Sequence, residues 1–221
     1  MPSVVRDMSA VRGSGSDDVV ADGAVVPARF TEVQLVKFPA LYDNPVFRIP
    51  TPLRLAYNKS AIGIGVARGA LDTFAVLAHT KKPLTSSTLL MDRPSAQMSM
   101  GECEAAWRAA RHFLFDAMDE VEEELRKGRD FPSAAATQNA RLACTHAAQV
   151  SMKIVDEIHA AAGTSAARMD SPLERKLRDA HGAASHRWVS RQIYADLGRI
   201  LLGHDPVPEF AGGAEGPVLG G

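Results

Sequence analysis

Cysteines and aromatic residues are scarce in this 221-residue chain. Only two residues are cysteines, and 6% are aromatic. Cys103 and Cys144 lie far apart, and neither belongs to a Cys-x-x-Cys pair or to a Cys/His spacing that would hold a metal ion. We therefore predict no metal site, and we expect two buried thiols in a reducing compartment.

An excess of one charge is also missing. The chain has 25 basic and 26 acidic residues, and no block of lysine and arginine is long enough to follow a phosphate backbone. No uncharged apolar run approaches the roughly 20 residues that span a bilayer, and the first residues lack the basic-then-apolar order of a signal peptide. We expect neither nucleic acid nor a membrane as a partner, and we predict a cytoplasmic protein.

Apolar residues are plentiful, at 46% of the chain, and from residue 58 onward they recur at helical spacing. The predicted helices cover about 58–80, 95–127, 133–162 and 172–202. Each pattern is followed by a helix-ending residue. These residues are Pro83, Gly128, Gly163 and Gly203. Four long helices with short links predict a mainly α fold, an antiparallel four-helix bundle.

The region before residue 58 has a different character. Asp22-Gly23 between valine pairs is a hairpin signal, whereas five prolines between residues 27 and 52 disfavour a long regular element. Because two strands alone are marginal, we expect a sheet whose other strands are absent from this sequence. The predicted organisation is a β-domain remnant over 1–30, a connector over 31–57, the bundle over 58–203 and a flexible tail over 204–221.

The last predicted helix has two unlike faces. At about 100° per residue, one face carries Arg175, Asp179, Gly182 and His186, and the opposite face is apolar. A solvated face is the simpler interpretation. The alternative is a site in which the gap at Gly182 admits a flat or bulky ligand and His186 exchanges a proton near neutral pH.

A second candidate site follows the third predicted helix. Gly163 would end that helix, and the hydroxyls of Thr164 and Ser165 come directly after it. Backbone N–H groups and hydroxyls gathered at such a turn can hold a phosphate or the polar edge of a ring. Helix capping alone also explains the pattern, and it is the simpler explanation.

Three stretches together resemble the acyl-CoA dehydrogenase superfamily. The ordered motif over 161–186 and the glycine-containing helix over 62–71 are similar to its C-terminal domain, and Arg-Gly-Ser-Gly-Ser at 12–16 is similar to a segment of its middle β domain. Ser14 stands where that segment usually has threonine. Among the branches of this superfamily, the two-component flavin-dependent monooxygenases are the most similar.

The resemblance implies a flavin, FAD or FMN, between the β domain and the bundle of a homotetramer. It implies that Gly163–Ser165 contacts the flavin and that Lys81 or Lys82 meets its phosphate. His186 would lie near the reactive edge of the ring, where it takes a proton from a small-molecule substrate or hydrogen-bonds the oxygenated cofactor. A separate flavin reductase would supply the reduced cofactor.

Three functions remain open from the sequence. Since the family's N-terminal helical domain and most of its β domain have no counterpart, we expect the C-terminal part of a flavin-dependent oxidoreductase, first of all a monooxygenase. An acyl-CoA dehydrogenase is the second possibility, although residues 194–203 lack the Tyr-Glu-Gly segment that often carries its carboxylate base. The third is a non-catalytic helical bundle that oligomerises or binds a partner.

Overall fold

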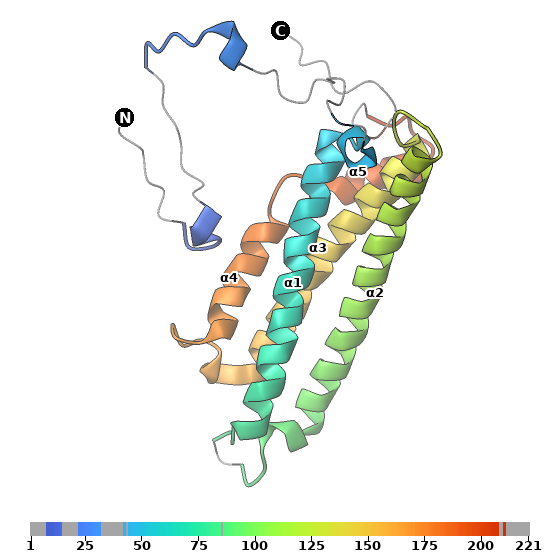
Figure 1. Cartoon of the computed structure of the whole chain (residues 1–221). Coiled ribbons are helices and arrows are strands. Elements are labelled where there is room, and N and C mark those ends of the chain that lie inside the picture. Colours follow the sequence, from blue (N-terminus) through green and yellow to red (C-terminus); the bar gives the residue numbers. More distant parts are fainter. Residues whose placement is uncertain are drawn as a thin grey trace.

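A computed structural model describes residues 8–14, 22–31, 42, 44–84, 86–207 and 210 of the chain. Four helices lie side by side as a bundle (Figure 1), namely α1 (Thr51–Thr80), α2 (Pro94–Arg126), α3 (Ala134–Ala162) and α4 (Pro172–Ala184). The short helix α5 (Gln192–Leu201) packs against α3. The short 3-10 helices are Arg12–Ser14, Ala28–Phe30, Pro45–Arg48, Leu90–Asp92 and Gly163–Ser165. The mainly α four-helix architecture predicted from the sequence is confirmed.

No strand occurs among the described residues. Asp22–Val26, the second half of the predicted hairpin, is irregular, and Val19–Ala21 lies outside the described residues. Gly23 has φ 64°, as a turn residue would. The strand prediction is therefore wrong for 22–26, consistent with the absence of partner strands that an isolated hairpin needs.

Helix α1 begins at Thr51 rather than near residue 58. Pro52 lies in its first turn, where a missing N–H costs no hydrogen bond, and buried Leu53 and Ala56 extend the apolar face. The bundle therefore starts inside the predicted connector. By length and composition α1 alone among the described helices could cross a membrane, and in the fold it packs against α2, α3 and α4.

Close packing of α1 against α3 depends on a small residue. A Cβ atom added at Gly63 would lie 3.4 Å from the Cβ of Ser151 and 3.5 Å from the Cα of Ala148, so the two backbones are near contact there. Glycine at position 63 therefore lets the two helices approach closely. Both cysteines are buried as predicted, and burial raises the pKa of each thiol to about 11.

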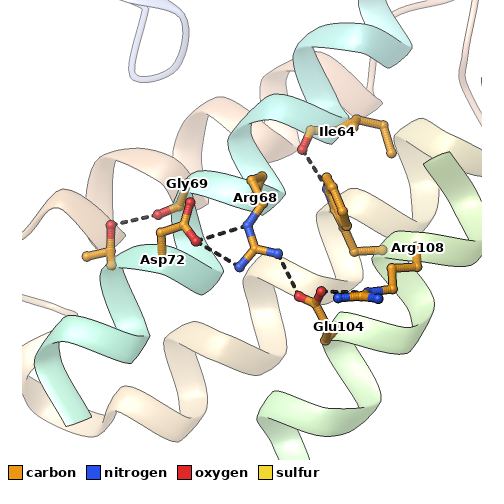
Figure 2. Close-up of polar contacts among 8 residues, drawn as sticks. Ile64, Arg68, Gly69, Asp72, Glu104 and Arg108 are labelled. Atoms are coloured by element: carbon orange, nitrogen blue, oxygen red, sulfur yellow. Dashed lines mark hydrogen bonds and ion pairs between the residues drawn. The ribbon is translucent and has the colours of Figure 1, made fainter. Parts of the chain in front are cut away.

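A cluster of charged side chains joins α1 to α2 (Figure 2). Glu104 on α2 accepts hydrogen bonds from Arg108 at 2.8 Å and from Arg68 of α1 at 2.6 Å, and Arg68 also pairs with Asp72. The Trp107 indole donates to a carbonyl of α1 at 3.0 Å beside them. The hydrogen bonds from the two arginines hold the pKa of Glu104 below its ordinary value.

The predicted fourth helix is interrupted after Ala184, and residues 185–191 form turns before α5 begins. Buried Gln149 of α3 faces this break. Its Nε2 atom donates to the carbonyl oxygens of Ala184 at 2.9 Å and Val189 at 3.0 Å. The prediction of one continuous helix through residue 202 is therefore wrong. The break leaves backbone carbonyls without an intrahelical partner, and the Gln149 amide of α3 hydrogen-bonds to them instead.

Phe210 lies in the segment predicted to be a flexible tail, yet its side chain is fully buried. Gln138 donates to its carbonyl at 2.9 Å, and its ring lies 5.3 Å from the guanidinium of buried Arg141. Trp188 flanks the same guanidinium at 5.5 Å, and Arg141 donates to the Pro52 carbonyl. The tail is thus anchored at Phe210 by packing and cation–π contact.

Candidate functional site

The turn after α3 lies against the residue that follows α1, Lys81. Gly163 has φ 60°, a conformation that favours glycine, and the 3-10 helix Gly163–Ser165 follows. The Lys81 ammonium donates to the Ala162 carbonyl at 2.5 Å, and a Cβ atom at Gly163 would lie 3.5 Å from it. Two candidates 82 positions apart in sequence, at 81 and 163, therefore lie side by side.

This turn presents polar groups to its surroundings. Gly163 and Thr164 are exposed and Ser165 is half-buried, and neither hydroxyl has a hydrogen-bond partner among the described residues. Lys82 is exposed next to Lys81 and forms no hydrogen bond or ion pair within the described part of the chain. Two hydroxyls beside an ammonium group suit a phosphate or the polar edge of a heterocycle.

His186 lies in the turns that follow α4 rather than on a helix. The Trp188 backbone N–H points at its Nδ1 atom at 3.4 Å, so the neutral imidazole carries its proton on Nε2. Burial lowers the pKa of His186, and the positive charges of Lys59 and Arg187 lower it further. A lowered pKa favours the neutral ring, and in the tautomer that accepts the Trp188 N–H the Nε2 atom carries the hydrogen.

The polar face of α4 is not the open surface that the sequence suggested. A Cβ atom at Gly182 would lie 2.9 Å from the Cβ of Ala10, and the Asp179 carboxylate accepts the Val11 N–H at 2.8 Å. The gap at Gly182, which the alternative interpretation assigned to a flat or bulky ligand, is taken up in part by an N-terminal segment of the chain itself. Beside the segment lies a cavity of about 370 Å³ that Ser185 also borders.

The two candidate sites, the Gly163–Ser165 turn and His186, lie at different ends of α4. The Gly163–Ser165 turn lies at the end of the bundle where α4 begins, and His186 follows the end of α4 (Figure 1). A helix of 13 residues is about 20 Å long. The length of α4 therefore lies between the two sites in the fold.

Comparison with known proteins decides the family. Residues 57–191 match the model of the acyl-CoA dehydrogenase C-terminal domain. The chain belongs to this family. The match confirms the resemblance read from the motif over 161–186 and from the helix over 62–71.

Curated relatives in this family extend well beyond the matched region. The indole-3-acetate monooxygenase of Pseudomonas putida is 32% identical over 204 residues, which are 92% of this chain and 52% of the relative. The p-hydroxyphenylacetate 3-hydroxylase oxygenase component of Acinetobacter baumannii is 26% identical over 75% of this chain and 39% of that protein. The chain thus spans about half or less of the relatives that it matches.

Solved structures share the fold. XiaF from a Streptomyces species, determined with FADH2 and glycerol, superposes with a TM-score of 0.68 over 74% of this chain and 42% of XiaF, at 22% identity. The 3-HSA hydroxylase from Rhodococcus sp. RHA1 gives a TM-score of 0.67 over 76% of this chain and 43% of that one, at 22% identity. At these identities the likeness establishes the fold alone.

Two residues that shape the site, Gln149 and Val11, were not identified from the sequence. Gln149, which holds the loop containing His186, lies on the buried face of α3 among small and apolar residues. A lone amide on such a face is the signal that could have indicated it, because a buried amide needs partners. Asp179 was singled out, but its partner Val11 is 168 positions away and no local pattern connects them.

Proposed function

We propose that this chain contributes the C-terminal bundle of the oxygenase component in a two-component flavin-dependent monooxygenase. The flavin-binding half of this proposal rests on the contact between Lys81 and the Gly163–Ser165 turn. The names of the relatives support the oxygenase part, since they include an indole-3-acetate monooxygenase and a p-hydroxyphenylacetate hydroxylase oxygenase component. A small aromatic compound is the corresponding substrate class.

In this proposal the turn holds reduced FAD or FMN. The hydroxyls of Thr164 and Ser165 donate to polar atoms of the cofactor, and Lys81 with Lys82 places positive charge near its phosphate. The bound flavin would supply the electrons and the oxygen chemistry. FADH2 in XiaF supports FAD as the first cofactor to test.

His186 serves as a hydrogen-bond donor near the reacting atoms. Its Nδ1 atom faces the Trp188 N–H and its pKa is lowered by burial, so Nε2–H is the group that it can present at neutral pH. Of the two roles that the resemblance allowed, donation from Nε2 suits this geometry better than abstraction of a substrate proton.

The separation of the two places favours an assembly. A flavin touched by Gly163–Ser165 of one chain and by His186 of another would lie between copies, which fits a homotetramer with shared sites. A separate flavin reductase would deliver the reduced cofactor, and we place the protein in the cytoplasm.

A dehydrogenase reaction has less support. Removing a proton next to a thioester needs a carboxylate base, and α5 carries no glutamate. Its acidic residue, Asp196, already accepts a hydrogen bond from Gln192 at 3.3 Å.

Anaerobic titration with FADH2 and with FMNH2, followed by flavin fluorescence, tests the cofactor site on the chain as it is. We expect weak but saturable binding, with the affinity of the double variant Thr164→Ala/Ser165→Ala reduced about tenfold because two hydrogen bonds are lost. Thr31→Ala, an exposed hydroxyl outside the bundle, is the control. No saturable binding, or equal affinity in the double variant, would contradict the site.

A further inference from the structure

A short N-terminal segment, Ser9–Val11, lies against α4 although the two are far apart in sequence. The Val11 N–H donates to the Asp179 carboxylate at 2.8 Å, and Arg178 donates to the Ser9 carbonyl. Arg178 is itself oriented by two hydrogen bonds to Glu174, at 2.7 and 2.8 Å. Two adjacent side chains of α4 thus bind backbone groups of one segment.

The surface of α4 is shaped for this segment at Gly182. Glycine inside a helix is unfavourable relative to alanine, so its presence needs a packing reason. Here the reason is Ala10, whose Cβ would lie 2.9 Å from a Cβ at Gly182 and whose neighbour Val11 would lie 3.6 Å away. Only a residue without a side chain lets the segment come this close.

The segment itself adopts an uncommon backbone. Val11 has φ 46°, and no other non-glycine residue in the described part of the chain has positive φ. A β-branched residue in this region is strained and persists only where surrounding contacts hold it. The hydrogen bond to Asp179 is such a contact.

We propose that Asp179 and Gly182 are positioning residues that dock Ser9–Val11 on α4. The docked segment fixes the Arg12–Ser14 turn that follows it and forms one wall of the 370 Å³ cavity bordered by Ser185, next to His186. The polar face of α4 is therefore a docking surface for this chain's own N-terminal segment, and its residues act on the site through that segment. This inference holds whether or not the protein binds flavin.

Hydrogen–deuterium exchange of the backbone amides in residues 8–14 tests the docking without cofactor or substrate. Asp179→Ala removes the acceptor, and Gly182→Ala places a methyl group against Ala10. In both variants we expect the Val11 amide to exchange about tenfold faster or more, because a hydrogen bond to a charged group is lost.

Two variants serve as matched controls. Asp179→Asn keeps an oxygen that can accept the Val11 N–H, and Gly65→Ala adds a methyl group where nothing lies within 4 Å. Gly65→Ala should exchange as the parent chain does, and Asp179→Asn, which keeps the acceptor but loses its charge, should accelerate exchange less than Asp179→Ala. Unchanged exchange in Asp179→Ala and Gly182→Ala would overturn the proposal, and so would equal acceleration in Asp179→Asn. Circular dichroism verifies the helices of each variant, and Asp179→Ala decides the test alone if Gly182→Ala does not fold.

Discussion

Single charged residues connect the helices of this bundle, and Glu104 is the clearest case. It accepts hydrogen bonds from arginines on two helices, and its side chain is only 27% exposed. Partial burial makes such charge-assisted bonds stronger than those of exposed pairs, because water competes less for the groups. The contribution of Glu104 to stability therefore depends on its ionisation.

The change Glu104→Gln should lower the free energy of unfolding by about 1–2 kcal/mol at pH 7. Because the folded-state pKa of Glu104 is lowered, its stabilisation is full above the unfolded-state pKa and is lost as pH falls through the folded-state pKa. The difference between parent and variant should therefore shrink below about pH 4.5. Urea denaturation at several pH values measures it.

The control for this prediction is Glu123→Gln. Glu123 pairs with Lys127 on the exposed face of α2, so its replacement should change stability less. A difference between parent and Glu104→Gln that stays constant with pH would show that ionisation of Glu104 is not what stabilises the fold.

Residue-level prediction from sequence succeeded where the chemistry is local. Gly163 could be assigned a positive φ because a helix pattern ended there, and the two hydroxyls follow in the sequence. The contact between Val11 and Asp179 and the burial of Phe210 could not be predicted from spacing, since each depends on segments that only the folded chain brings together.

Among the structural elements, the break between α4 and α5 matters most for the site, because His186 lies in it. Apolar periodicity continues through the break, as buried Trp188 and Val189 show, so the sequence favoured one helix. Periodicity indicates which face is buried, and it does not report that Gln149 of α3 supplies hydrogen bonds to interrupted carbonyls. The start of α1 was missed for a related reason, since Pro52 is compatible with a first helical turn.

Replacing Gln149 by leucine should destabilise the protein by about 2–3 kcal/mol, because two buried carbonyl groups lose their donor. The loop 185–191 should also lose amide protection in hydrogen–deuterium exchange. Denaturant unfolding gives the first quantity and exchange of that peptide gives the second.

Gln192→Leu is the matched control for this change, since Gln192 is exposed and its replacement should alter stability by less than about 0.5 kcal/mol. If Gln149→Leu were as mild as Gln192→Leu, the loop would not depend on the amide of α3.

At the scale of the whole molecule, one segment that precedes the helices in sequence and one residue that follows them pack onto the bundle. Ser9–Val11 docks on α4 through Asp179, and Phe210 fills a pocket beside α3 and α5. The sequence predicted the bundle and its family, because helix patterns and an ordered motif are local signals. The sequence did not predict that the Gly163–Ser165 turn and His186 lie at different ends of α4, and the structure was needed to show it.

Our proposal places the activity in a protein larger than one bundle, since the chain spans 52% of the indole-3-acetate monooxygenase of Pseudomonas putida. The matched part of the Pseudomonas putida indole-3-acetate monooxygenase, 52% of that protein, can be replaced by this chain. Such a chimera retains the relative's other half and makes the bundle the only part under test.

The most direct measurement supplies this chimera with reduced flavin from a reductase and follows labelled oxygen from O2 into the product of indole-3-acetate by mass spectrometry. The proposal predicts incorporation of one labelled oxygen atom, with a rate at least about tenfold lower in His186→Ala, since positioned proton donors contribute that much or more, and unchanged in Gly65→Ala. A folded chimera that binds reduced flavin but forms no labelled product, or one whose labelled product is insensitive to His186→Ala, would contradict it.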